Sequence, residues 1–184
     1  MLIVSYYTPG YSGHAAVLEA SCDAYGYHHE ILGCPDRGDW QANERLKTSF
    51  LIGRRFQHPR ERLLWVDADG EMMAPAAGNF DPPEPCDIGV HHHHLDRLAS
   101  PGTLLVEPTD AAWRFLCVWN EQTSVIGDDK ASFAAAVALV PGLRVWRLPE
   151  SHCFIRDLAA DPCGPVVVEH HQASREMRRK ERAR

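Results

Sequence analysis

The chain of 184 residues has the length of one domain and can bury about 70% of the surface that its unfolded form exposes. Its hydrophobic content of 45% and charged content of 24% are ordinary for a globular protein. Six cysteines without a Cys-x-x-Cys pair indicate neither a zinc site nor a disulfide framework. The N-terminus lacks a signal peptide and no apolar run reaches membrane-spanning length, so we expect a cytoplasmic enzyme or binding protein.

The net charge of −6 is unevenly distributed along the chain. Residues 175–184 hold six basic and two acidic side chains, so the first 174 residues carry a charge of −10. We therefore expect one domain, residues 1–174, followed by a basic C-terminal tail, residues 175–184. Such a tail fits either contact with a polyanion, nucleic acid or a membrane surface, or a solvated, frayed terminal helix, and the solvated helix is the simpler interpretation.

The first third of the chain alternates between strand patterns and helix patterns. In chain order we expect a strand at 2–7, a helix at 13–26, a strand at 28–32, a helix at 40–57 and a strand at 63–66. Asp39 is placed to cap the second of these helices. Alternation of this kind predicts an α/β domain with a mixed, largely parallel sheet flanked by helices.

The strand at 63–66 is the segment that most strongly indicates a site. Its apolar residues Leu-Leu-Trp-Val suit a strand covered on both faces, and they lead directly into Asp67 and Asp69. These carboxylates would lie at the carboxyl edge of the sheet, where open α/β folds bind ligands, and both would point to the same side. They could share a hard divalent cation. The alternative is a solvated Asp-Gly turn.

The second part of the chain continues with strands and helices after a Pro/Gly-rich loop. We expect strands at 87–90 and 102–106, a helix at 110–122 capped by Thr109, a helix at 128–139, and strands at 143–148 and 166–169. The last strand would deliver His170 and His171 to a sheet edge. Four consecutive histidines, 91–94, are interpreted as an exposed loop.

Six segments together resemble small nucleotide-diphospho-sugar transferases of the GT-A glycosyltransferase fold. They are residues 5–10, residues 36–40 with Asn43 and Lys47, residues 64–69, residues 102–105 with Thr109, the pair Asp128-Asp129, and residues 170–175. The resemblance covers nearly the whole chain. It implies a single-domain, Rossmann-like GT-A fold and transfer of a sugar from a nucleotide-diphospho-sugar, more specifically a UDP-sugar, to a hydroxyl acceptor.

The resemblance also implies which residues meet the donor. Tyr6, Tyr7 and Thr8 would contact the base and ribose, with core packing as the alternative for the tyrosines. Asp69 would ligate Mn²⁺ or Mg²⁺ directly, and Asp67 would contact the ribose or the metal through water. His170 would complete the coordination, with His171 in reserve.

Three more residues receive roles from the resemblance. Lys47 would bind a phosphate, although a helical lysine is commonly solvated. Asp128 or Asp129 would lie on the acceptor side, as general base or as a sugar-binding carboxylate. Alternatively, Asp128 is an N-cap and Asp129 a partner of the helix dipole. The acceptor could include a hydroxymethylated base in phage-type DNA, because the tail is basic.

Two other functions fit part of the sequence. A haloacid-dehalogenase-like Mg²⁺-dependent phosphatase also has a strand that ends in Asp-x-Asp-Gly, and it would use Asp67 as the nucleophile. That family needs a lysine between its two acidic motifs, and no lysine lies between Asp69 and Asp128. The second alternative is a non-catalytic protein that binds a nucleotide-sugar, for which the retained Asp128 and Asp129 are not required.

Overall fold

A six-stranded sheet forms the centre of the computed structural model, which describes residues 1–75, 78–93, 98–156, 158, 164–173 and 175. The strand order is β2-β1-β3-β6-β5-β7. The bounds are β1 (Leu2–Tyr7), β2 (His28–Gly33), β3 (Leu63–Val66), β5 (Ile88–His92), β6 (Ala99–Val106) and β7 (Val145–Leu148). All pairings are parallel except those of β6 with β3 and β5, so the expected mixed, largely parallel sheet is confirmed.

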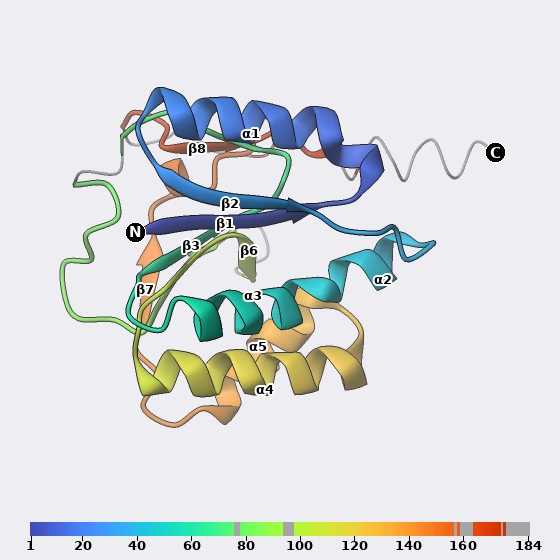
Figure 1. Ribbon diagram of the computed structural model, residues 1–184. Helices are drawn as coiled ribbons and strands as arrows, with labels where there is room; N and C mark the ends of the chain where they lie inside the picture. The colour runs from blue at the N-terminus through green and yellow to red at the C-terminus, as the bar shows by residue number, and fades with distance from the viewer. Residues whose placement is uncertain (76–77, 94–97, 157, 159–163, 174, 176–184) are drawn as a thin grey trace.

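Helices cover both faces of the sheet (Figure 1). One face carries α1 (Ser12–Ala24), together with a small antiparallel pair of β4 (Gly70–Met72) and β8 (Val168–His170). The other face carries α3 (Leu46–Gln57), α4 (Asp110–Ile126) and α5 (Asp129–Leu139). Two short 3-10 helices are also present, η1 (Pro9–Tyr11) and η2 (Glu150–His152).

Strand β3 is buried on both sides, as its unbroken apolar sequence predicts. Leu63 and Trp65 join the core under α3, α4 and α5, whereas Leu64 and Val66 join the core under α1. Successive strand residues point to opposite faces, so each side needs apolar residues when helices cover both. The strand is therefore rigidly held where the acidic residues follow it.

The predicted helix caps are confirmed. The side chains of Asp39, Thr109 and Asp128 accept hydrogen bonds from backbone amides three residues ahead, over 2.7, 3.1 and 2.8 Å. Each bond satisfies an amide that has no partner within the first turn of its helix.

The helix expected at 40–57 is two helices, α2 (Trp40–Glu44) and α3, which meet at Arg45. The hydroxyl of Tyr6 donates to the carbonyl of Asn43 over 2.7 Å. In a continuous helix that carbonyl would accept from the amide four residues ahead. The break leaves α2 beyond the carboxyl ends of β1 and β2, beside the site described below (Figure 1).

The prediction of an exposed loop at 91–94 is wrong for the first two histidines, because His91 and His92 belong to β5. His91 is buried, and its Nδ1 lies 3.2 Å from the carbonyl of Leu148. The pairing of β5 with β6 changes register between Val90 and His91. His94 lies outside the described residues.

Strand β4 was not expected at all, since it is only three residues long. The other predicted helices and strands are present, with ends that differ by four residues or fewer. Of the expected basic tail, only Arg175 is described. Among the described residues, no helix is long and apolar enough to cross a membrane.

Candidate active site

The turn after β3 and the pairing of β4 with β8 bring two carboxylates and an imidazole together. The amide of Gly70 donates to the carbonyl of Asp67 over 2.7 Å, which closes a tight turn. Gly70 then pairs with His170 across the small sheet. As a result, one ligand atom each of Asp67, Asp69 and His170 lies within 4.8 Å of the other two. We call these three residues the Asp-Asp-His triad.

His170 is buried, and both of its ring nitrogens have defined neighbours. Nε2 lies 2.9 Å from the hydroxyl of Thr103, and Nδ1 lies 3.8 Å from Oδ1 of Asp69. Burial lowers the pKa of His170, but the Cys153 sulfur and the Asp69 carboxylate raise it well above its ordinary value overall. The Nδ1 edge of the ring therefore faces the carboxylates.

Asp69 is held in place from two directions. Its Oδ2 accepts a hydrogen bond from the amide of Ala173 over 2.8 Å, and its backbone carbonyl accepts one from the amide of His171. Burial raises the pKa of Asp69, but His170 and the Ala173 amide lower it below its ordinary value overall. The Ala173 amide and the side chain of His170 therefore stabilise the ionised form of this buried carboxylate.

His171, the reserve ligand, points elsewhere. Its Nε2 lies 2.9 Å from Oε2 of Glu71. Of the two adjacent histidines, only His170 belongs to the triad.

The absence of a side chain at Gly102 leaves room for Asp67 and His170 to lie close together. A Cβ at this position would lie 3.3 Å from Oδ2 of Asp67 and 3.2 Å from Cε1 of His170. The backbone of β6 thus forms the floor against which Asp67 and His170 converge. Carboxylate oxygens and a neutral imidazole nitrogen are donors that suit Mn²⁺ and Mg²⁺, so these residues could hold such an ion.

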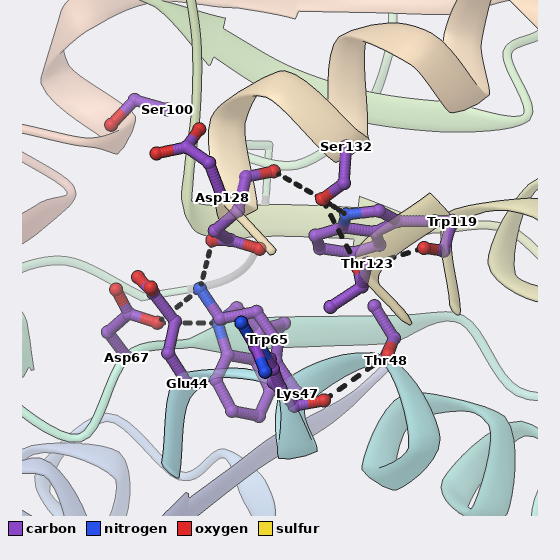
Figure 2. A network of polar contacts seen from close by, with 12 residues as sticks. Glu44, Lys47, Thr48, Trp65, Asp67, Ser100, Trp119, Thr123, Asp128 and Ser132 are labelled. Carbon is purple, nitrogen blue, oxygen red and sulfur yellow. Dashed lines mark hydrogen bonds and ion pairs between the residues drawn. The ribbon is translucent and has the colours of Figure 1, made fainter. Parts of the chain in front are cut away.

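Lys47 is buried between two carboxylates (Figure 2). Its Nζ lies 3.1 Å from Oδ1 of Asp67 and 3.1 Å from Oδ2 of Asp129. Burial lowers the pKa of Lys47, but Asp129 and Asp67 raise it well above its ordinary value overall. The alternative prediction from the sequence, that Lys47 is a solvated helical lysine, is therefore wrong.

The two oxygens of Asp67 have different neighbours. Oδ1 accepts from Nε1 of Trp65 over 2.8 Å as well as from Lys47. Oδ2 is the oxygen that lies beside Gly102, on the side of His170. Asp67 therefore joins the ion pair with Lys47 to the triad.

Two cavities meet at this point. The smaller cavity, of about 170 Å³, is lined by Tyr7, Thr8, Tyr11 and Asn43 among others. The larger cavity, of about 490 Å³, extends over Ser100, Gly102, Cys153, Asp128 and Asp129. Both are lined by the same five residues at their junction: Trp40, Glu44, Lys47, Asp67 and Gln172.

Solved structures share this architecture. The crystal structure of a glycosyltransferase involved in the glycosylation of the major capsid of PBCV-1 superposes with a TM-score of 0.76 and 15% sequence identity, over 98% of this chain and 97% of that one. The galactosyltransferase LgtC, in complex with donor and acceptor sugar analogues, superposes with a TM-score of 0.62 and 12% identity, over 94% of this chain and 87% of that one. The chain has the GT-A glycosyltransferase fold. No family model matches the sequence, and no curated protein sequence matches it.

Tyr6, Tyr7 and Thr8, the three residues expected to contact the base and ribose, differ in their surroundings. Tyr6 packs against the rings of Phe50 and Trp65, with ring centres 5.3 and 5.4 Å away, and burial raises its pKa. This is the core packing considered as an alternative, although one side of Tyr6 still lines the smaller cavity. Tyr7 and Thr8 line that cavity as well.

Asp128 and Asp129 open α5 on the wall of the larger cavity. Oδ1 of Asp128 caps the helix, and Oδ2 of Asp129 binds Lys47. Burial raises the pKa of Asp129, and Lys47 only partly offsets that effect. Both carboxylates therefore have structural partners in addition to their place on the cavity.

Glu44 is the site residue that the sequence did not reveal. It is half-buried at the end of α2 and lines both cavities. Burial, and then the negative charge of Asp129, raise the pKa of Glu44 to about 7, against the opposing effect of Lys47. No motif marks this glutamate, since its position depends on the break between α2 and α3.

Proposed function

We propose that the chain is a metal-dependent glycosyltransferase that moves a sugar from a nucleotide-diphospho-sugar to a hydroxyl acceptor. The observation that carries this proposal is the position of the Asp-Asp-His triad, which lies where two cavities meet in a GT-A fold. Two joined cavities suit a reaction with two substrates. A divalent cation at their junction suits a donor whose leaving group is a diphosphate.

The smaller cavity is assigned to the nucleotide. Tyr7 and Thr8 line it at the end of β1, as expected for contacts with the base and ribose. We infer UDP as the nucleotide because the resemblance of the sequence implies it. Tyr6 would contribute one edge of its ring while packing in the core.

The diphosphate is assigned to the junction. Asp67, Asp69 and His170 would hold Mn²⁺ or Mg²⁺ there, through carboxylate oxygens and Nδ1. When bound, the cation neutralises the charge that develops on the leaving diphosphate. Lys47 would add a positive charge beside it, because its Nζ already lies against Asp67.

The sugar and the acceptor are assigned to the larger cavity. Its wall carries the carboxylates of Glu44, Asp128 and Asp129, which favour an uncharged hydroxyl compound over a polyanion. A hydroxymethylated base in DNA is therefore the less favoured acceptor. That expectation depended on the tail at 175–184, of which only Arg175 is described.

The phosphatase alternative receives less support. Asp67, its nucleophile, has Oδ1 bonded to both Lys47 and Trp65. The similarity of the fold to glycosyltransferases, over nearly the whole chain, also argues against it.

Release of UDP from UDP-glucose and UDP-galactose tests the proposal, with water as acceptor and Mn²⁺ present. Wild type should release UDP, and both EDTA and Asp69→Asn should abolish the release. Asp110→Asn changes an exposed carboxylate on α4 and should leave the rate unaltered. Release that is insensitive to EDTA and to Asp69→Asn would contradict metal-dependent transfer at this site.

A further inference from the structure

Glu44 lies at the junction where the donor and the acceptor would react. It ends α2, and it lines the smaller cavity and the larger cavity at once. Figure 2 shows its side chain beside Lys47 and Asp67, the two residues with which it shares the junction and interacts electrostatically. A side chain in this place can reach both the donor sugar and an incoming hydroxyl.

The carboxylates near Glu44, one at the junction and two on the wall of the larger cavity, each have one oxygen that already has a partner. Oδ2 of Asp129 binds Lys47, and Oδ1 of Asp67 binds Lys47 and Trp65. Oδ1 of Asp128 caps α5. By contrast, the carboxylate of Glu44 makes no hydrogen bond or ion pair within the described part of the chain, and only its backbone carbonyl accepts a hydrogen bond, from Tyr6. Among these described residues, Glu44 is therefore the carboxylate with both oxygens available to a substrate, whereas each of the three aspartates has one oxygen engaged.

We propose that Glu44 is a catalytic residue, the general base that accepts the proton of the acceptor hydroxyl. The inference rests on the proposed function. In the transfer, the acceptor oxygen forms a bond to the anomeric carbon, and the bond from that carbon to the diphosphate oxygen breaks. The bonding electron pair leaves with the diphosphate, and the acceptor proton passes to the Glu44 carboxylate.

The surroundings of Glu44 suit this role. Lys47 faces it from α3, Asp67 from the turn after β3, and Asp128 and Asp129 from the start of α5. Glu44 also lines both cavities, so its carboxylate can lie against an acceptor hydroxyl at the point where the donor would react. A positioned carboxylate of this kind can take up the proton of the attacking group.

Glu44→Gln tests the role, because the amide keeps the shape of the side chain but cannot accept the proton as a base. With UDP-glucose or UDP-galactose and Mn²⁺, we expect kcat for UDP release to fall by about 100-fold or more, while KM for the donor changes little. Sodium formate should restore part of the rate of Glu44→Ala and none of the rate of Glu44→Gln. Glu121→Gln, an exposed change on α4, serves as the matched control and should match wild type.

The outcomes separate this inference from the proposed function. If wild type releases UDP and Glu44→Gln releases it within about threefold of the same rate, the assignment of Glu44 is wrong and the glycosyltransferase function stands. An increase in KM with kcat unchanged would likewise show that Glu44 is not the general base, and it would indicate a role in binding. If wild type neither binds nor cleaves any nucleotide-sugar, the proposed function fails and the inference fails with it. The unfolding temperature of each variant shows whether it is folded.

Discussion

The hydroxyl of Thr103 lies 2.9 Å from Nε2 of His170, and both residues are buried. A hydrogen bond at Nε2 fixes which edge of the imidazole faces the carboxylates. Nδ1 is the nitrogen left on the side of Asp69, at 3.8 Å. Partners behind metal-binding histidines commonly set the orientation of the ring in this way.

Thr103→Val should therefore weaken Mn²⁺ binding. The valine keeps the shape of the side chain and removes the oxygen that orients His170, so we expect an affinity about 10-fold lower. Thr103→Ser keeps the hydroxyl and should bind nearly as well as wild type. The Mn²⁺ affinity of each variant can be measured from the rise in its unfolding temperature as Mn²⁺ is added. Equal affinities for the valine and serine variants would show that the hydrogen bond does not position the ring.

Lys47→Met should destabilise the fold strongly at neutral pH. The change leaves Asp129 buried without its cation, and removal of one partner of a buried pair costs about 3 kcal/mol or more. Urea unfolding measures the loss. Asp129→Asn in the same background should recover part of it, because the amide carries no charge.

The loss caused by Lys47→Met should also shrink as the pH falls. Burial already raises the pKa of Asp129, and removal of Lys47 raises it further. A carboxyl whose pKa is higher in the folded state than in the unfolded state binds its proton more tightly when folded, so the folded variant gains stability below neutral pH. A loss of equal size at pH 5 and pH 7.5 would contradict the pairing of Lys47 with Asp129.

Asp87→Asn should lower the free energy of unfolding by about 2 kcal/mol at pH 7. Asp87 accepts hydrogen bonds from Arg144, chiefly through the guanidinium, and these bonds lower its pKa from 3.8 to about 2. This stability is fully present above the ordinary pKa and is lost as the pH falls through the lower one. The difference between wild type and variant should therefore vanish between pH 4 and pH 2. Acid titration of both proteins, followed by circular dichroism, checks the expected convergence.

The sequence predicted the fold where local pattern and tertiary packing agree. Strand β3 has apolar residues on both faces, and helices do cover both faces. The caps at Thr109 and Asp128 depend only on neighbouring amides, which the sequence order supplies. The same strand led directly to Asp67 and Asp69, which the structure places beside His170.

The features that the sequence missed depend on contacts between distant segments. The break after Glu44 involves the hydroxyl of Tyr6, and the helical pattern across 40–57 carries no sign of that contact. The sequence alone does not show that Lys47 is buried in ion pairs, because its partners Asp67 and Asp129 belong to other elements. His91 is buried by β7, which follows it by more than 50 residues.

Thermal unfolding with UDP and Mn²⁺ tests the central claim most directly. Wild type should be stabilised by UDP and Mn²⁺ together by several degrees, since a ligand at about 100 times its dissociation constant contributes about 2.7 kcal/mol. Either ligand alone should have little effect, and Asp69→Ala should abolish the joint effect. Stabilisation by Mg²⁺ with a phosphate mimic, without any response to UDP and Mn²⁺, would contradict the account and favour a phosphatase with Asp67 as its nucleophile.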